Sequence, residues 1–403
     1  MVLPAGSPCG ACHHNPSGGG GRNTVGYGVG RSMGALKFHG SDTNYIIADG
    51  LSAGYDARIQ WARFGTPYRV VDESGNQRIG EPEFKAIPMQ AQIELGYEVN
   101  RSISLYGTYN MGPNTWDGEW CDPVFPGMSC IEAALQYQSD SMSIRGGLIQ
   151  PSIGIRNDDH TSLIRSDAAT PRRPLIPPNY AEYGAEYAYQ SSSLLRTEIG
   201  VFDRTRLDRS LNTQTKTAEL GPVAYLLRLS SMPKFRIGGS QPAASSQSGQ
   251  PPPESSDDFG DDFDDDFDDD FDSVPVKPTI LQTLFGGSVF GSGEFYILNA
   301  FAGAGLKNGL EMRVEASRSV RSTEYISHAI SVASTWAIFP WLVPHLRVER
   351  GTTEKDQTYQ TDQFVFGIEF FPLSGVEIRP EYRVSKTREY LFGQPTIQLH
   401  LFY

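Results

Sequence analysis

Apolar and polar residues alternate at every second position over most of the chain from residue 51 onward. In the first such segment, one face carries Leu51, Ala53, Tyr55, Ala57, Ile59 and Trp61. The other face is mainly polar, with Asp56, Arg58 and Gln60. A β-strand places successive side chains on opposite faces, so this strand separates an apolar environment from water.

The same period predicts sixteen strands, near residues 51–62, 87–99, 102–112, 130–138, 141–150, 180–190, 193–204, 217–231, 279–290, 294–305, 310–320, 324–336, 339–350, 361–371, 375–387 and 394–403. Most have the roughly ten residues that a tilted strand needs to cross a hydrocarbon layer. The chain contains no run of eighteen apolar residues, as a membrane helix would need. We therefore predict an all-β fold, a transmembrane antiparallel outer-membrane β-barrel over residues 51–403, with the even strand number that such barrels have.

The predicted connections alternate between short turns, such as residues 139–141, and long loops. The long loops are residues 65–83, 113–129, 151–179 and 205–216. Outer-membrane barrels have short periplasmic turns and long external loops. A low-complexity segment, residues 240–275, interrupts the barrel after the eighth strand. Strand counting places this insert in the periplasm, provided that residues 234–239 do not form a separate strand.

Charged residues share one face of the predicted strand 375–387. They are Glu377, Arg379, Glu381 and Arg383. Charges are too costly to face lipid, so this face lines a watery or plugged lumen. Pro380 lies in the same strand, where its missing N–H weakens the hydrogen-bond ladder. Other charged positions predicted to line the lumen are Asp56, Arg58, Glu94, Arg145, Glu182, Glu186, Arg196, Glu311, Arg313 and Glu315.

The last predicted strand ends on an aromatic residue. Its apolar face consists of Ile397, Leu399, Leu401 and Tyr403. This pattern resembles the C-terminal signal of bacterial outer-membrane barrels, and it favours the bacterial outer membrane as the location, with outer-membrane lipid around the barrel. The alternative is a terminal strand of a soluble sheet.

The net charge is −13, and eleven aspartates between Asp257 and Asp272 account for most of it. Phenylalanines recur between them at positions 259, 263, 267 and 271. Like charges at this density predict disorder. Three interpretations stay open: a solvated linker, a docking arm for a basic redox partner, or a weak cation-binding tract.

The chain has four cysteines, an even number that is typical of an oxidising compartment. Cys121 and Cys130 lie nine residues apart around a Pro-Gly loop, and we predict a disulfide between them. The alternative is a pair of free thiols.

The other two cysteines lie in the segment Cys-Gly-Ala-Cys-His, which runs from Cys9 to His13. This spacing predicts covalent attachment of one haem c, with thioethers at Cys9 and Cys12 and iron ligation by His13. Residues 1–50 are predicted to form a small c-type haem plug, because glycine-rich backbone packs closely against a flat macrocycle. A flexible tail is the alternative. A zinc site that adds His14 is the other chemical interpretation, but thiolate zinc sites favour reducing compartments.

The identity of the iron ligand opposite His13 stays open. Met33 and His39 are the leading distal candidates, because they belong to the same segment as the motif. The weaker candidates are His14, His345 and His400. Alternation turns His345 and His400 into the lumen, whereas His160 and His328 are expected in a loop or on the surface.

The chain contains no GxSxG, GxxxxGK[ST] or HExxH motif. These motifs mark common hydrolytic and nucleotide-binding sites. The sequence therefore offers no sign of such chemistry, and no nucleic-acid partner is expected.

A haem c motif ahead of a sixteen-stranded barrel resembles the fused outer-membrane monohaem cytochrome-porins of iron-oxidising bacteria. The resemblance rests on Cys9, Cys12, His13 and Tyr403. Residues 5–8 and 14–16, which flank the motif, depart from the family pattern.

The resemblance implies electron transfer across the outer membrane, from an extracellular donor such as ferrous iron to a periplasmic c-type cytochrome or another redox carrier. Whether the protein is a ferrous iron oxidase stays open. The alternatives are a passive porin or transporter whose haem plug is structural or sensory, and a structural barrel without haem.

Overall fold

A computed structural model gives the fold of the chain and describes residues 46–48, 50–64, 69–71, 77–79, 83–110, 131–155, 162–167, 170–174, 176, 180–192, 194–212, 218–237, 279–306, 309–322, 325–373, 375–388 and 391–402. The predicted plug as far as residue 45, the Cys121–Cys130 pair, His160, the acidic insert and Tyr403 lie outside these residues.

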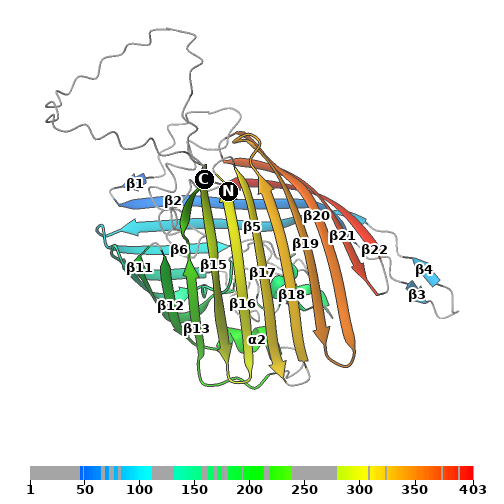
Figure 1. The fold of residues 1–403 in the computed structure, drawn as a ribbon, viewed down its shortest axis with the longest axis horizontal. Helices are drawn as coiled ribbons and strands as arrows, with labels where there is room; N and C mark the ends of the chain where they lie inside the picture. The colour runs from blue at the N-terminus through cyan, green and yellow to red at the C-terminus, as the bar shows by residue number, and fades with distance from the viewer. Residues whose placement is uncertain are drawn as a thin grey trace, which may run out of the picture.

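The described chain is almost entirely β-structure (Figure 1). Its strands are β1 (Ile46–Ala48), β2 (Leu51–Phe64), β3 (Arg69–Val71), β4 (Gln77–Ile79), β5 (Glu83–Glu98), β6 (Ile103–Asn110), β7 (Ile131–Gln138), β8 (Met142–Ile149), β9 (Ser166–Asp167), β10 (Thr170–Pro174), β11 (Glu182–Ser192), β12 (Leu195–Phe202), β13 (Ala224–Ser231), β14 (Lys234–Ile237), β15 (Thr279–Ser292), β16 (Phe295–Leu306), β17 (Leu310–Ser322), β18 (Tyr325–Trp336), β19 (Leu342–Glu354), β20 (Thr358–Leu373), β21 (Val376–Thr387) and β22 (Leu391–Phe402).

One sheet of eighteen strands forms a closed ring, because β22 pairs with β2 along the segment from Asp56 to Ala62. All pairs are antiparallel. The three-residue strand β1 pairs with the start of β2, and β13 and β14 both pair with β15 as one interrupted strand. The wall of the barrel therefore has sixteen strands, which confirms the predicted fold class. In Figure 1 the near strands β15 to β19 cross the far strands β2, β5 and β6 steeply, as expected for strands tilted about 40° from a barrel axis.

Residues 234–237 continue β13 rather than forming an additional wall strand. The two residues that flank the undescribed segment, Ile237 and Thr279, pair with each other. Their pair lies at the end of the barrel that also holds the short turns and the start of β2. The acidic insert is thus attached at the short-turn end. Its assignment to the periplasm stays a prediction that follows from the general orientation of outer-membrane barrels.

Outward-facing side chains form an apolar surface, whereas inward-facing ones are mainly polar. Examples of the outward set are Tyr55, Ile93, Leu135, Ile199 and Phe366, each between 46% and 55% exposed. Near the short-turn end, Phe339 stacks on Trp341 at 5.0 Å, and Trp341 meets the edge of Phe370 at 6.0 Å. Aromatic residues at this height are typical of the membrane interface.

Pro380 lies in the middle of β21, a position that the hydrophobic pattern does not explain. Its strand pairs with β22 through Pro380 and Ile397. On the other side, β20 and β21 pair at Gly367–Glu381 and again at Phe370–Ile378, in the same register. The ladder is interrupted between these pairs, where Pro380 has no N–H to donate. The register shifts by one residue only farther on, between Phe370 and Leu373. The proline therefore leaves one gap in the hydrogen-bond ladder, and the strand register is the same on both sides of that gap.

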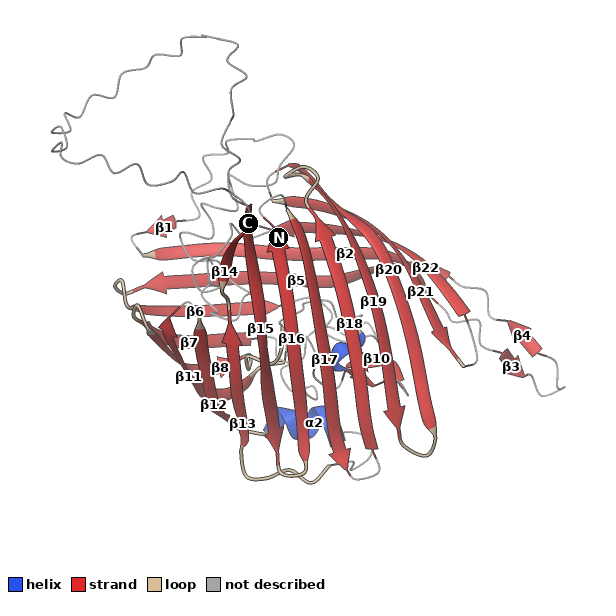
Figure 2. Cartoon of the chain, in the orientation of Figure 1, coloured by secondary structure: helices blue, strands red, loops and turns tan. Residues whose placement is uncertain are grey.

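Two short helices lie in connections that the sequence predicted to be loops. The helix α2 (Thr205–Asn212) follows β12, and the 3-10 turn η2 (Leu163–Arg165) lies between β8 and β11. Figure 2 shows the blue helices together with β10 within the outline of the barrel, towards the long-loop end. Hydrophobic periodicity is too short in such segments to predict a helix.

Candidate functional site: a lumen crossed by an inward-folded loop

The lumen is lined by charged and amide side chains that the barrel wall almost fully buries. Prominent among them are Gln60, Glu94, Glu132, Arg145, Glu186, Glu198, Glu315, Glu349, Glu381 and Arg383. The predicted alternation is confirmed on β21, where Glu377, Glu381 and Arg383 are less than 10% exposed and face inward. Buried charges need partners, and they find them in ion pairs along the wall, such as Arg145–Glu186 and Arg383–Glu381, or in hydrogen bonds.

The connection between β8 and β11 runs across this lumen. The amide of Gly154 donates to Ser288 on β15 at 2.8 Å, and the amide of Ile155 donates to Glu315 on β17 at 3.1 Å. Further along, the Ser162 hydroxyl donates to Glu349 on β19 at 2.7 Å. Because β8 lies several strands away from β15, β17 and β19 around the ring, the described part of this connection crosses the barrel interior. We call the described residues of this connection, 150–155 and 162–167, the lumen loop.

Two buried carboxylates hold the middle and the far part of the lumen loop. Glu349, 2% exposed, also accepts from Leu163 N at 3.3 Å and from Gln363 at 2.9 Å, and it pairs with Arg347 at 3.1 Å. Glu315, 6% exposed, also accepts from Asn299 at 3.0 Å. Hydrogen bonds to an ionised acceptor are about twice as strong as neutral ones.

Gly154 lies close against the wall. Its φ is +58°, and a Cβ atom at this position would lie 2.1 Å from Oε1 of Glu315. Both the left-handed backbone and the lack of space require glycine here.

The near end of the lumen loop is held by an ion pair. Arg145 Nη2 lies 2.9 Å from Glu186 Oε1, and both side chains are at most 3% exposed. Arg145 also donates to the carbonyl of Gln150 at 2.9 Å, and Ser152 Oγ donates to Glu186 at 2.7 Å. The sequence predicted Arg145 and Glu186 to be lumen lining; the structure shows that they fix the start of the loop.

An apolar cluster fills part of the lumen next to the loop. Its members include Ile153, Ile176, Tyr180, Phe202, Leu207, Leu211, Phe290 and Phe295. Glu182 closes the start of helix α2 by accepting from the amides of Arg206 at 2.8 Å and Leu207 at 3.3 Å. A carboxylate at a helix N-terminus satisfies free amides and is favoured by the helix dipole. The cluster and the loop together occupy part of the barrel interior.

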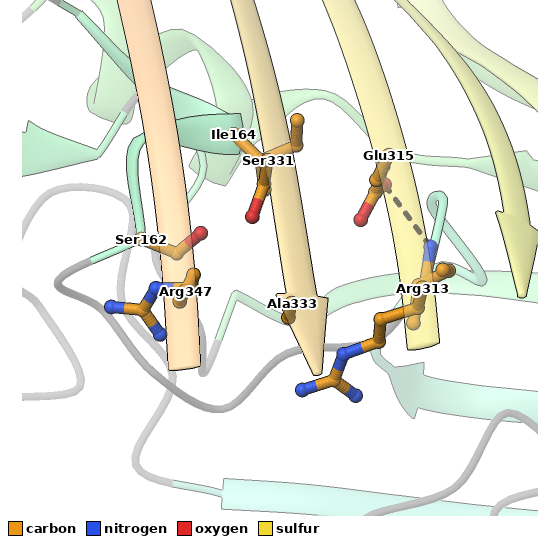
Figure 3. A pocket seen from close by; sticks show the side chains of 8 residues that line it. Ser162, Ile164, Arg313, Glu315, Ser331, Ala333 and Arg347 are labelled. Atoms are coloured by element: carbon orange, nitrogen blue, oxygen red, sulfur yellow. Dashed lines mark hydrogen bonds between the residues drawn. The ribbon is translucent and has the colours of Figure 1, made fainter. Parts of the chain in front are cut away.

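A small cavity remains between the lumen loop and the wall (Figure 3). It is lined by Ile155, Ser162, Ile164, Arg313, Glu315, Ser331, Ala333 and Arg347. Its volume of about 20 Å³ is enough for roughly one water molecule. The cavity is a gap in the packing between the loop and the wall, and it is too small for an organic substrate.

The two lumen histidines lie near the short-turn end. In His400, Nδ1 is 2.8 Å from Glu377 and Nε2 is 3.0 Å from Asp56, so both ring nitrogens contact carboxylates. His345 is 8% exposed, and its Nε2 lies 3.5 Å from Glu381. Both face the lumen, as predicted.

A His345 ring nitrogen, Nδ1, is buried without a hydrogen-bond partner among the described residues. The absent side chain of Gly367 makes room for this ring, because a Cβ there would lie 2.4 Å from His345 Cε1. His328, by contrast, faces outward and is exposed.

The predicted haem site cannot be placed. Cys9, Cys12, His13, His14, Met33 and His39 lie outside the described residues, and so do Cys121 and Cys130. Haem attachment and the disulfide stay predictions. Within the described ranges, no group of three or more His, Cys, Asp or Glu side chains could hold a metal ion. Nor does that part of the chain contain a helix long and apolar enough to cross a membrane.

The sequence did not single out the residues that hold the loop, namely Ser162, Ser288, Asn299, Arg347, Glu349 and Gln363. Alternation places Glu349 and Arg347 on the lumen face, but it gives no signal that a loop binds them. Only contacts between distant parts of the chain identify these residues.

No protein-family model matches the chain, and neither does any curated protein. Among solved structures, the chain is similar to OprB of Pseudomonas putida, with a TM-score of 0.52 and 10% identity, over 92% of this chain and 99% of that one. It is also similar to OmpF of Salmonella typhi, solved in complex with daunomycin, with a TM-score of 0.50 and 11% identity, over 88% of this chain and 98% of that one. These similarities show a shared fold, that of the outer-membrane porins. With an apolar outer face around a polar lumen, the chain is an integral, multi-pass outer-membrane protein.

Proposed function

We propose that the protein is a passive channel for small hydrophilic solutes, with the lumen loop setting the width of the passage. The observation that carries this proposal is the loop itself, pinned across a polar lumen by Glu315 and Glu349. A sixteen-stranded barrel is wide enough to leave an aqueous passage, so an element that crosses it controls what passes. OprB and OmpF share the barrel fold, which supports this reading.

Single-channel conductance in a planar bilayer tests the proposal. In the double variant Glu315→Ala/Glu349→Ala, the loop loses hydrogen bonds to two carboxylates, each contributing about 1.5–3 kcal/mol. Docking of the loop should weaken, and the conductance should rise and become noisier.

The matched control is Glu311→Ala. Glu311 lies on β17 like Glu315 and is half-buried on the lumen face, four residues nearer the short-turn end. Its conductance should equal that of the unaltered protein. A barrel that conducts no ions in its native form would overturn the channel proposal. Equal conductance in all three proteins would show that the loop does not set the width.

Electron transfer through a haem c is the second candidate, and the motif from Cys9 to His13 favours it. The described chain begins at Ile46, where β1 pairs with the start of β2 at the short-turn end. The segment that carries the motif therefore joins the barrel at this end. His345 and His400, two of the distal candidates, lie in the lumen near the same end. The haem would exchange electrons with a periplasmic c-type cytochrome, using an external donor such as ferrous iron.

A visible spectrum after expression with haem-maturation machinery tests this second candidate. Soret and α bands in the unaltered protein, absent in Cys9→Ala, would support covalent haem. Reduction of that haem by external ferrous iron would support the conduit. A protein without these bands would end the electron-transfer proposal and leave the channel proposal intact, since conductance does not depend on haem.

A further inference from the structure

On the described strands, the outward charges of the barrel are concentrated near the long-loop end of β17 to β21. The residues concerned are Arg318, His328, Arg350, Asp362 and Lys386. Each is at most four residues from the long-loop end of its strand, and alternation with apolar neighbours points each away from the lumen. We call this set the outer basic patch.

Strand register makes the patch contiguous. Arg318 is the partner of His328 across β17 and β18, and Asp362 is the partner of both Arg350 and Lys386 across β19 to β21. Directly paired side chains on antiparallel strands lie about 5 Å apart at Cβ. Nε of Arg350 lies 2.6 Å from Oδ1 of Asp362, while the Arg350 side chain stays 62% exposed. Asp362 thus orients a guanidinium group that remains accessible from the lipid side.

Apolar side chains lie directly below the patch on the same strands. They are Ile330, Val348, Phe364, Phe366 and Tyr382, all facing outward and exposed. Charged groups are excluded from the hydrocarbon of a bilayer. The change from charged to apolar residues therefore marks the boundary of the hydrocarbon layer and places the outer basic patch at the height of the lipid headgroups.

On the other described wall strands the outward charge is limited to Arg63, near the long-loop end of β2. The outward positions of β6 to β8, β11 to β13, β15, β16 and β22, as far as the structure describes them, carry no Asp, Glu, Lys or Arg. A general requirement of membrane insertion would place charges around the whole ring. Their concentration on five adjacent strands indicates a local function.

Basic residues outnumber acidic ones in the patch. Arg318, Arg350 and Lys386 stand against Asp362. In the adjoining turns and strand ends, the exposed Lys355 and Arg388 offset Glu354 and Asp356. Guanidinium groups bind phosphate oxygens in pairs of parallel hydrogen bonds, and basic side chains at a bilayer surface attract anionic headgroups. We propose that the outer basic patch binds the phosphate groups of an anionic lipid in the external leaflet, whose acyl chains lie against the apolar residues below.

Native mass spectrometry of the full chain in neutral detergent tests the proposal, with lipid A, phosphatidylcholine and inorganic phosphate as probes. The unaltered protein should retain lipid A in preference to phosphatidylcholine. In Arg318→Gln/Arg350→Gln/Lys386→Gln, affinity for lipid A should fall on the order of 100-fold, from three basic residues that each contribute several-fold. Equal retention of both lipids by the unaltered protein would overturn the proposal. So would binding of free phosphate that the triple variant abolishes, because the site would then recognise a small anion.

The control variant Arg101→Gln/Lys234→Gln/Arg236→Gln removes the same charge from exposed positions at the short-turn end. It should bind lipid A like the unaltered protein; an equal loss there would mean that net charge alone governs binding. Folding of each variant is checked by its heat-dependent mobility on a gel. If the triple variant does not fold, the single variants Arg318→Gln and Lys386→Gln serve instead, since both leave the Arg350–Asp362 pair intact.

The substitution Asp362→Asn should change the affinity for lipid A in the opposite direction. It removes the acidic member of the patch, so affinity for lipid A should rise several-fold. A fall in affinity would contradict the proposed role of charge.

Discussion

At the level of single residues, the carboxylates of the lumen act mainly as structural acceptors. Glu186, Glu315 and Glu349 each accept from backbone amides or serine hydroxyls of the lumen loop as well as from neighbouring side chains. All three are less than 10% exposed. A buried charge with several donors is costly to leave without them, so single substitutions at these positions act on stability.

Glu186→Gln removes the charged partner of Arg145, which is 2% exposed. Because a buried guanidinium is left without its counter-charge, we expect the free energy of unfolding to fall by about 3 kcal/mol. Urea unfolding, followed by the gel mobility of the folded barrel, measures this change. Replacing both partners, as in Arg145→Met/Glu186→Leu, should recover part of the loss, and a double variant as unstable as Glu186→Gln would contradict the explanation.

Asp203, in the connection between β12 and α2, gives a pH-dependent test. A hydrogen bond from the Thr205 hydroxyl, with help from backbone amides, lowers the pKa of Asp203 below its ordinary value of 3.8. A lowered pKa in the folded state stabilises the fold above the unfolded pKa, and this contribution is lost as the pH falls through the folded value. In Thr205→Val the pKa of Asp203 should therefore rise towards 3.8, as measured by NMR titration of labelled aspartate carboxyls. An unchanged pKa would assign the shift to the backbone amides alone.

At the level of elements, the lumen loop is held at both of its described ends and at a glycine between them. Arg145 and Glu186 fix its start, Gly154 lies against Glu315, and Glu349 holds Ser162. Such fixed points keep a connection in one position, whereas a connection without them would lie on the surface, where its backbone can bind water. The loop is therefore part of the interior of the barrel.

Gly154→Val should displace this loop. The added side chain would overlap the Glu315 carboxylate, and valine disfavours a φ of +58°. We expect a higher and more variable single-channel conductance, with a loss of about 1–3 kcal/mol in unfolding free energy. Gly305→Ala on β16 is the control, because a Cβ there would meet its nearest neighbour at 4.0 Å, and its conductance should be unchanged. A valine variant that conducts like the control would show that the loop tolerates displacement at this point.

At the level of the whole molecule, closure depends on the pairing of the first and last wall strands. Ile59 on β2 is the partner of Leu399 on β22, and both face outward. These two residues are neighbours in space but lie at opposite ends of the barrel sequence, so no local sequence pattern determines their pairing. Closure leaves no free sheet edge, whose backbone N–H and C=O groups would find no hydrogen-bond partner in lipid.

Ile59→Cys/Leu399→Cys, in a chain whose four native cysteines are replaced by serine, tests closure. A short bis-thiol reagent should link the two positions in the folded barrel, because paired residues lie about 5 Å apart at Cβ. Mass spectrometry of linked peptides detects the product. The pair Ile59→Cys/Leu346→Cys, with Leu346 outward on β19, should give no link, and a link there would contradict the observed strand order.

The strand count and the two faces of each strand followed from the sequence, because a period of two is a local property that lipid outside and water inside impose on every strand. The inward direction of Asp56, Glu94, Arg145, His345 and His400 followed in the same way. Strand ends were less well predicted: β13 begins at Ala224, seven residues after its predicted start. Where a loop packs against the wall, apolar and polar residues no longer alternate regularly, so the pattern does not show where the strand begins or ends.

Tertiary structure alone decided the position of the lumen loop. Its contacts join residues 134, 160 and 187 positions apart, at Gly154–Ser288, Ile155–Glu315 and Ser162–Glu349. No local pattern in the chain encodes which carboxylate accepts from which amide, because the closed ring brings them together only once all its strands have paired. The sequence by itself therefore determined the barrel and its polar interior, and the tertiary structure decided what occupies that interior.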